Sequence, residues 1–445
     1  MIAIKTLKLR TRRVRKGKDR ILRELMADWK QLVEYFFDIC VRYDVKSKAK
    51  LHALAYSASK SIVPDKKWHS KYRYTAMEVA VATYKSWTKL KKKRRAEKRP
   101  EFKKFFLKLY KESNGIGVYR IFRKDDAWFV RIATTPRNAV VLPLVVSDYE
   151  AKFLEVWMKG KIILGEAYLR RLSDGSYELH IAIKKEVEEK DFERRLGVDI
   201  NERNVTLSVL DGGRVIYAER VGLDGIVELD YTYKMVWIRR LQKKLYSGEN
   251  PRHLPKWKIK IIQRYAGRWR RRKEHLLHVV AKRIVALATT FQARIVLEDL
   301  RDIKSRILNK SRRLNRRLFL ADFRKLQFLI EYKARWVGIP VSYVDPRRTS
   351  RLCPICGSPM TGLSQRELVC GRCGVVFDRD FAASINIALR DVARGVRAET
   401  PMSWVLRRSV SADGCPWEGT TCAMRGRYSS PNITKTWEYL PRVKR

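Results

Sequence analysis

Two closely spaced pairs of cysteines constrain the fold of this chain more than any other feature of its sequence. Thirteen residues separate the two CxxC pairs, which are Cys353 with Cys356 and Cys370 with Cys373. Each pair can lie on a tight turn and supply two thiolates, and this is the ligand spacing of a tetrahedral zinc ribbon. The sequence therefore predicts a structural Zn²⁺ ion held by four thiolates, within a ribbon that spans residues 346–376.

Three acidic residues stand where an apolar side chain would otherwise be favoured. Asp199 lies inside a short apolar strand, Glu298 ends another, and Asp380 immediately precedes a helical run. A carboxylate in a buried strand is costly unless a cation compensates its charge. Two divalent ions about 3.5 to 4 Å apart would do so while clamping a phosphodiester for hydrolysis. Hard oxygen ligands favour Mg²⁺ or Mn²⁺. The order of the three acids, in a strand hairpin, a later strand and a terminal helix, is the layout of an RNase H-like fold.

The chain carries a large excess of positive charge. Lys and Arg number 98 against 47 Asp and Glu, which leaves a formal net charge of +51 over 445 residues. Such a chain repels itself unless a polyanion neutralises it, and nucleic acid is the usual polyanion. Aromatic residues make up 11% of the chain, enough to stack on bases as well as to fill a core. We therefore expect a nucleic-acid partner.

Apolar segments are too short for a membrane protein. No apolar run approaches the roughly 20 residues of a spanning helix, and residues 1–13 lack the apolar core of a signal peptide. We expect a cytoplasmic, nucleoid-associated protein without a membrane partner, where reducing conditions favour metal-bound cysteine. Cys40 is expected to be a small buried apolar residue. Cys415 and Cys422 form either a second metal or redox pair or two free thiols, and we favour free thiols.

Hydrophobic periodicity divides the first half of the chain into three parts. Residues 1–20 read as a strand that runs into a basic stretch. From residue 21 to about 112, apolar residues recur at three- and four-residue steps, which is typical of helices. The basic block 89–99 within this part is expected to face phosphates. Short alternating runs from residue 115 to 186 predict a small β-barrel or sandwich.

Strands alternate with longer helices in the second half of the chain. Strands are expected at 196–200, 204–210, 214–218, 294–299 and 341–344, and helices at 228–247, 255–290 and 319–337. Asp211-Gly-Gly213 is a hairpin turn. Residues 301–317 contain eight Lys or Arg and one Asp, a composition typical of a mobile loop facing nucleic acid. The last residues, 396–445, lack periodicity and are expected to form a poorly ordered tail.

Four segments resemble one known family in their order and spacing. They are Gly197-Val-Asp-Ile200, Val296-Leu-Glu-Asp-Leu300, Thr349-Ser-Arg-Leu-Cys-Pro-Ile-Cys-Gly357, and Phe377-Asp-Arg-Asp380 with Asn386-Ile387. These look like the split RuvC motifs and inserted zinc ribbon of the TnpB (OrfB) family, over roughly residues 195–390. Members of that family are transposon-encoded, RNA-guided DNA nucleases related to the type V CRISPR effectors.

The resemblance implies an α/β multidomain protein. An RNase H-like (RuvC) nuclease domain would contain the inserted zinc ribbon, and an N-terminal β-barrel (wedge-like) would contain an inserted helical recognition lobe. The implied boundaries are 1–20 and 115–193 for the barrel, 21–114 for the recognition lobe, 194–345 and 377–395 for the nuclease domain, 346–376 for the ribbon and 396–445 for the tail.

The resemblance also implies roles for individual residues. Asp199, Glu298 and Asp380 would be the catalytic, magnesium-binding carboxylates, and the four ribbon cysteines would bind zinc. Family members usually have Asn two residues after the last catalytic Asp, whereas this chain has Ala382. Asp378 is expected to cap the helix that Asp380 opens.

These features predict an RNA-guided DNA endonuclease. A noncoding guide RNA would select double-stranded target DNA by base pairing, next to a short flanking motif that the protein reads. One alternative is an RNA-guided DNA-binding repressor without cleavage, which would be expected to have lost at least one of the three acids. A second is a three-acid DNA transposase, because strand transfer and hydrolysis differ only in the nucleophile.

Overall fold

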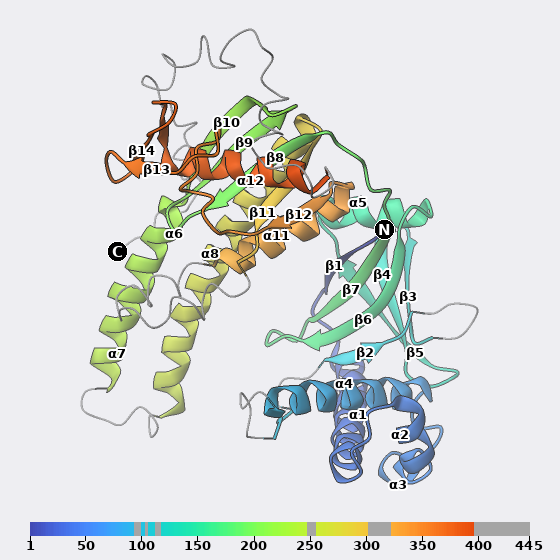
Figure 1. Ribbon diagram of the computed structural model, residues 1–445. Helices are drawn as coiled ribbons and strands as arrows, with labels where there is room; N and C mark the ends of the chain where they lie inside the picture. Colours follow the sequence, from blue (N-terminus) through green and yellow to red (C-terminus); the bar gives the residue numbers. More distant parts are fainter. Residues whose placement is uncertain (93–98, 103–105, 112–116, 247–254, 301–321, 396–445) are drawn as a thin grey trace. The chain divides into compact units, whose positions relative to one another are not determined.

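The chain divides into two compact units, Met1–Glu188 and Glu189–Arg445. The computed structural model in Figure 1 describes residues 1–92, 99–102, 106–111, 117–246, 255–300 and 322–395. Several predictions made from the sequence lie outside these described residues, namely the tail at 396–445 with Cys415 and Cys422, the basic loop at 301–317, and positions 93–98 of the basic block.

An antiparallel sheet of seven strands forms the centre of the first unit. In spatial order the strands are β2 (Leu107–Leu109), β6 (Ile163–Arg171), β7 (Tyr177–Glu186), β1 (Ile2–Thr11), β5 (Ala139–Val145), β4 (Ala127–Ala133) and β3 (Tyr119–Lys124). Backbone hydrogen bonds also link the first and last strands of this order, β2 and β3. The carbonyl of Tyr110, next to β2, accepts hydrogen bonds from the N–H groups of Val118 (3.0 Å) and Tyr119 (3.1 Å). This link closes the sheet on itself.

Among the described residues, four helices stand between β1 and β2 in the sequence: α1 (Lys16–Arg42), α2 (Lys48–Ala55), α3 (Ser59–Ile62) and α4 (Lys71–Lys92). Apolar residues at helical spacing, including Leu25, Trp29 and Phe36, form the buried stripe of α1. α1 packs on α4, where the Trp29 indole N–H donates to Thr75 Oγ1 at 2.9 Å. A fifth helix, α5 (Asp148–Met158), lies between β5 and β6.

The helical prediction was wrong at the end of this segment. Leu107–Leu109 is not helical but forms strand β2, which pairs with β6. All three residues of β2 are buried. A segment of three residues is too short to show a hydrophobic period, so pairing with β6 decides its conformation.

A mixed five-stranded sheet forms the centre of the second unit. Its order is β10 (Arg214–Gly222), β9 (Asn204–Asp211), β8 (Arg194–Ile200), β11 (Ala293–Glu298) and β12 (Val341–Val344). β8, β11 and β12 run parallel, whereas β8, β9 and β10 pair antiparallel. The predicted hairpin turn is confirmed, since Asp211 pairs with Arg214 and both intervening glycines have positive φ, 54° and 88°.

Helices cover both faces of this sheet, which gives the second unit its α/β architecture (Figure 1). α8 (Lys256–Thr290) and α11 (Phe323–Val337) pack on the face that carries Leu196 and Val198. α12 (Arg379–Gly395) packs on β8 and β9 from the opposite face, where Gly197 lies. α6 (Asp224–Leu229), the π-helix η1 (Asp230–Ile238) and α7 (Arg239–Tyr246) precede α8.

A small antiparallel sheet lies between β12 and α12 in the sequence. It consists of β13 (Met360–Gly362), β14 (Glu367–Cys370) and β15 (Val376–Asp378), in that spatial order. β15 is followed directly by α12, so the last strand of this small sheet is continuous with the first turn of α12. Within the described residues, no helix combines the length and the apolar character that crossing a membrane requires.

Gly197 permits the close approach of α12 to the sheet. A Cβ atom at this position would lie 1.9 Å from the Ser384 carbonyl oxygen and 3.0 Å from the Ala388 Cβ. Neither atom can rotate away, because one is backbone and the other is the first atom of its side chain. We expect Gly197→Ala to destabilise the second unit by about 1–3 kcal/mol or more, measured as a lower midpoint of thermal unfolding.

Gly17→Ala is the matched control for this substitution. Gly17 lies in the first turn of α1, and no atom lies within 4 Å of an added Cβ. Since Ala favours helix more than Gly does, this variant should be at least as stable as the parent. Equal midpoints for the two variants would contradict the close packing of α12 on β8.

Candidate functional site

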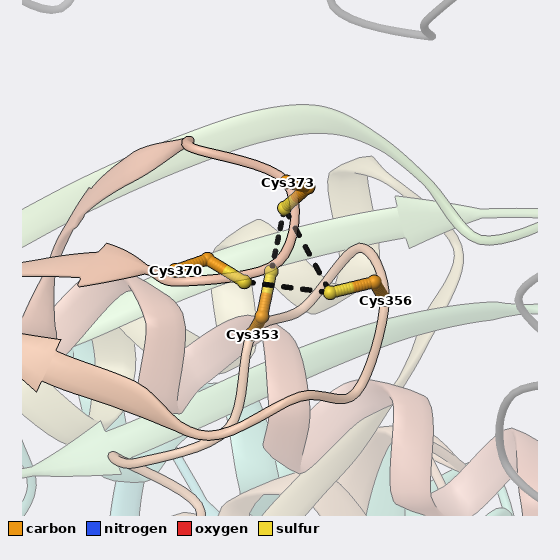
Figure 2. Close-up of side chains that lie close together, drawn as sticks. All are labelled: Cys353, Cys356, Cys370 and Cys373. Atoms are coloured by element: carbon orange, nitrogen blue, oxygen red, sulfur yellow. Dashed lines mark hydrogen bonds between the residues drawn. The ribbon is translucent and has the colours of Figure 1, made fainter.

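The four ribbon cysteines come together in space. Figure 2 shows their sulfur atoms pointing toward one another. The Cys356 Sγ lies 3.4 Å from that of Cys370 and 3.7 Å from that of Cys373, and Cys353 Sγ lies 3.6 Å from Cys373 Sγ. All four lie within 4.8 Å of one another. A tetrahedral site with Zn–S bonds of about 2.3 Å places its sulfurs about 3.8 Å apart, so these residues fit a Zn²⁺ ion.

Each CxxC pair is held by the same kind of turn. The N–H of Gly357 donates to the Cys353 carbonyl, and the N–H of Gly374 donates to the Cys370 carbonyl, both at 2.9 Å. The two glycines have φ values of 72° and 68°, in the left-handed region that side chains disfavour. The sequence therefore specifies both turns locally, and folding brings the two pairs together.

Asp199 is a buried acid on the face of β8 that α12 covers. Only 7% of the residue is exposed, and the Asn201 amide donates to its Oδ2 at 2.7 Å. Burial, followed by the charge of Glu298 and then that of Asp380, raises the pKa of Asp199 to about 8, against the opposing hydrogen bond from Asn201. Both other predicted acids therefore act on this carboxylate.

Glu298 ends β11, the parallel neighbour of β8. Thr349 donates a hydrogen bond of 2.7 Å to its Oε1, and Gln327 donates to its backbone carbonyl at 2.7 Å. Burial raises the pKa of this carboxyl group, and the Thr349 hydroxyl opposes the rise. Parallel strands end at the same edge of a sheet, which explains why Glu298 reaches the neighbourhood of Asp199.

Asp380, in the first turn of α12, and Asp378, at the end of β15, have different surroundings. The Asp378 Oδ1 accepts hydrogen bonds from the N–H groups of Asp380 (2.9 Å) and Phe381 (3.3 Å), so the predicted helix cap is confirmed. Asp380 instead points its Oδ2 toward the Asn204 amide at 3.4 Å. The Arg220 guanidinium contacts both acids, at 2.5 Å from Asp378 and 3.6 Å from Asp380.

The three acids are less compact than the cysteines. Among the described residues, the four cysteines are the potential metal ligands that cluster in a group of three or more, with ligand atoms within 4.8 Å of one another. Glu298 on β11 and Asp380 on α12 each act electrostatically on Asp199 on β8, and carboxylate oxygens are ligands that Mg²⁺ and Mn²⁺ prefer.

Several residues of this neighbourhood were not predicted from the sequence. They are Asn201, Asn204, Arg220 and Thr349, each of which contacts one of the three acids. Asn201 lies in the turn after β8 and Asn204 begins β9, and a polar residue at the end of a strand carries no distinctive pattern. Ala382, at the position where the resemblance led us to expect Asn, is fully buried and belongs to an apolar cluster with Leu210 and Cys353.

Comparison with known proteins places this chain in one class, the TnpB proteins related to type V CRISPR effectors. The family model of the Cas12f1-like TNB domain matches residues 323–387. A TnpB-like protein of Methanocaldococcus jannaschii is 38% identical over 259 residues, which cover 58% of this chain and 89% of that protein. This chain belongs to the TnpB-like family.

More distant similarities extend to CRISPR-associated proteins. The endodeoxyribonuclease Cas12f2 of a Micrarchaeota archaeon is 29% identical over 242 residues, covering 48% of this chain and 41% of that protein. A cryo-EM structure of a Cas12f1–sgRNA–target DNA complex contains a chain of similar fold, with a TM-score of 0.61 and 16% identity. The similarity covers 84% of this chain and 83% of that chain.

Proposed function

We propose that this protein is a transposon-encoded, RNA-guided DNA endonuclease that cuts DNA by metal-dependent phosphodiester hydrolysis. Membership of the TnpB-like family supports the general assignment, and the relative Cas12f2 is itself named an endodeoxyribonuclease. The observation that carries the proposal is the burial of Asp199 close to the charges of two other acids. It is buried, and its pKa is raised to about 8 by burial and by the charges of Glu298 and Asp380. A divalent cation would relieve that repulsion.

Asp199, Glu298 and Asp380 are the proposed ligands of Mg²⁺ or Mn²⁺. Carboxylate oxygens suit both ions. When bound, such ions stabilise the attacking and leaving oxygens of an in-line displacement. The chain's own residues hold the three carboxylates in place: Asn201 orients Asp199, Thr349 orients Glu298, and Asn204 and Arg220 lie against Asp380.

The proposed domain roles follow the sequence prediction. Residues 194–345 and 377–395 would form the RuvC-like nuclease domain, and 346–376 its zinc ribbon. The closed sheet of the first unit, from residues 1–20 and 115–193, would be the wedge-like barrel, and the helices within 21–114 the recognition lobe. The guide RNA and double-stranded target DNA would be the partners that the net charge of +51 requires.

The central experiment identifies the guide and then tests cleavage. The full chain is purified with its RNA, and that RNA is sequenced. A plasmid carrying a matching target beside randomised flanking bases is then incubated with the complex and Mg²⁺. We expect one RNA species and double-strand cuts that require both the match and one flanking motif. RNA of random sequence, or cutting that ignores the match, would overturn the proposal.

The same experiment separates the two alternatives. A guided repressor binds the matched plasmid and leaves it intact, whereas a transposase joins a DNA end to the plasmid. All three predicted acids are present and reach one neighbourhood, which favours hydrolysis over binding alone. An Asp199→Ala complex is the control for contaminating nucleases, because it should bind the plasmid without cutting it.

Salt dependence tests the proposed polyanion partner. Each phosphate that the protein neutralises adds about 0.9 to the slope of log affinity against log salt on B-DNA. With a net charge of +51, we expect affinity for duplex DNA to fall by about 10³-fold or more between 50 and 200 mM NaCl. Filter binding at several salt concentrations measures the slope, and a nearly flat plot would contradict the proposed role of the charge.

A further inference from the structure

We propose that Thr349 is a positioning residue that sets the affinity of the nuclease site for its divalent cation, by fixing the carboxylate of Glu298. The inference rests on the proposed function, since it assumes that Glu298 binds that cation. It extends that function to the first residues of the zinc ribbon, because Thr349 lies within 346–376 and four positions before Cys353.

The contact between Thr349 and Glu298 is short and sheltered. The Thr349 Oγ1 lies 2.7 Å from Glu298 Oε1, and Thr349 is only 4% exposed. The same hydroxyl lies 3.2 Å from the Pro346 carbonyl, but it has a single proton to donate. The shorter contact is to a carboxylate, and hydrogen bonds to charged acceptors are the stronger ones. The bond uses Oε1 and leaves Oε2 for a metal ion.

Thr349 is itself held by the helix that carries Asp380. The Asn386 amide donates to the carbonyls of Thr349 and Leu352, both at 2.8 Å, and Asn386 is only 4% exposed. Farther along α12, the Arg390 guanidinium donates to the Arg347 carbonyl at 2.5 Å and to the Asp345 carbonyl. Four backbone carbonyls between residues 345 and 352 are therefore fixed to α12.

In this arrangement one helix, α12, positions two of the three acids. α12 carries Asp380 directly, and it orients Glu298 through Asn386 and then Thr349. Groups that hydrogen-bond to a metal ligand typically change metal affinity or activity by about 10- to 100-fold when they are removed. We expect the Thr349 hydroxyl to have an effect of this size.

The variant Thr349→Val removes the hydroxyl and keeps the branched shape. Thr349→Ser keeps the hydroxyl, and Ser350→Ala removes a neighbouring hydroxyl that takes no part in these contacts. Thr349→Ala replaces the Val variant should the Val variant fail to fold. Each full-length protein is purified with its RNA, and its Mn²⁺ binding is measured from the EPR signal of free Mn²⁺. Glu298→Gln gives the baseline of Mn²⁺ bound elsewhere, including on RNA.

We expect Thr349→Val to weaken Mn²⁺ binding at the site by about 10-fold or more. The Mg²⁺ concentration that gives half-maximal cleavage should rise in parallel, and high Mg²⁺ should restore the rate. Thr349→Ser and Ser350→Ala should match the parent in both measurements. Unchanged Mn²⁺ binding in Thr349→Val would overturn the inference, even if cleavage fell, because a purely structural defect lowers the rate at every Mg²⁺ concentration.

The two readouts keep this inference separate from the proposed function. If the parent complex fails to cleave guided DNA, the proposed function is wrong, and the Mn²⁺ measurement still decides whether Thr349 controls a cation site at Glu298. If the parent cleaves and Thr349→Val binds Mn²⁺ as the parent does, the proposed function stands and the role assigned to Thr349 is wrong.

Discussion

Asp380→Ala should reduce guided, Mg²⁺-dependent cleavage to the background rate while leaving guide and target binding intact. The carboxylate lies in the first turn of α12 and acts electrostatically on Asp199, so its loss removes a proposed metal ligand from the chemical step. It is not a phosphate-binding cation, so its loss removes no attraction for nucleic acid. Cleavage of a labelled target and filter binding of the same target measure the two properties side by side.

Asp378 supplies the matched control, because it is two residues away and has a different role. Asp378→Asn keeps an oxygen that can accept from the N–H groups of Asp380 and Phe381, and Asn caps helices about as well as Asp. This variant should retain most of the cleavage rate. Asp378→Ala should also cleave, with a loss of about 1 kcal/mol of stability from the missing cap. The reverse ranking of rates would make Asp378 the third metal ligand.

Replacing Cys373 by Ser should release the zinc ion and loosen the chain from Cys353 to Asp378. The four thiolates meet only through their tertiary arrangement, and a structural zinc site contributes about 10 to 16 kcal/mol of apparent binding free energy that is coupled to folding. Because β15 runs directly into α12, the loss should also disturb the Asp378 cap. Elemental analysis gives the zinc content, and hydrogen exchange of residues 353–378 reports the loosening.

Cys40→Ala controls for the loss of a thiol without the loss of a ligand. Cys40 is fully buried in α1, and burial raises the pKa of its thiol to about 11, so it is a packing residue as predicted. This variant should keep one zinc ion per chain. A parent protein that contains no zinc would end the ribbon proposal, whatever the variants show.

The zinc ribbon and the acids could be predicted from the sequence because their patterns are local. Each CxxC pair encodes its own turn, closed by Gly357 or Gly374, and the spacing of the pairs fixes the ligand set. Asp199 and Glu298 were recognisable because a carboxylate in an apolar strand is rare without compensation. The cap at Asp378 also follows a local rule, since it contacts N–H groups two and three residues ahead.

Arg220 could not be placed from the sequence, because a β-bulge decides which way it points. If β10 paired with β9 in regular register from the hairpin pair Asp211 and Arg214 onward, Glu219 would lie opposite Thr206. The bulge between Val215 and Tyr217 shifts the pairing by one residue, so Arg220 lies opposite Thr206, which in turn pairs with Asp199. One extra residue turns a strand's side chains to the other face.

The sequence by itself determined the cysteine set of the ribbon, the helix cap and most strands, because each depends on residues close together in the chain. It also predicted the three acids, each from its own local pattern. Only the tertiary structure decided that Leu107–Leu109 is a strand, that Arg220 reaches Asp378, and that Thr349 holds Glu298. These features depend on pairing partners up to 158 residues away. A local pattern cannot encode such partners, because tertiary packing brings them together: β2 pairs with β6 in the first unit, and α12 packs against the sheet of the second unit.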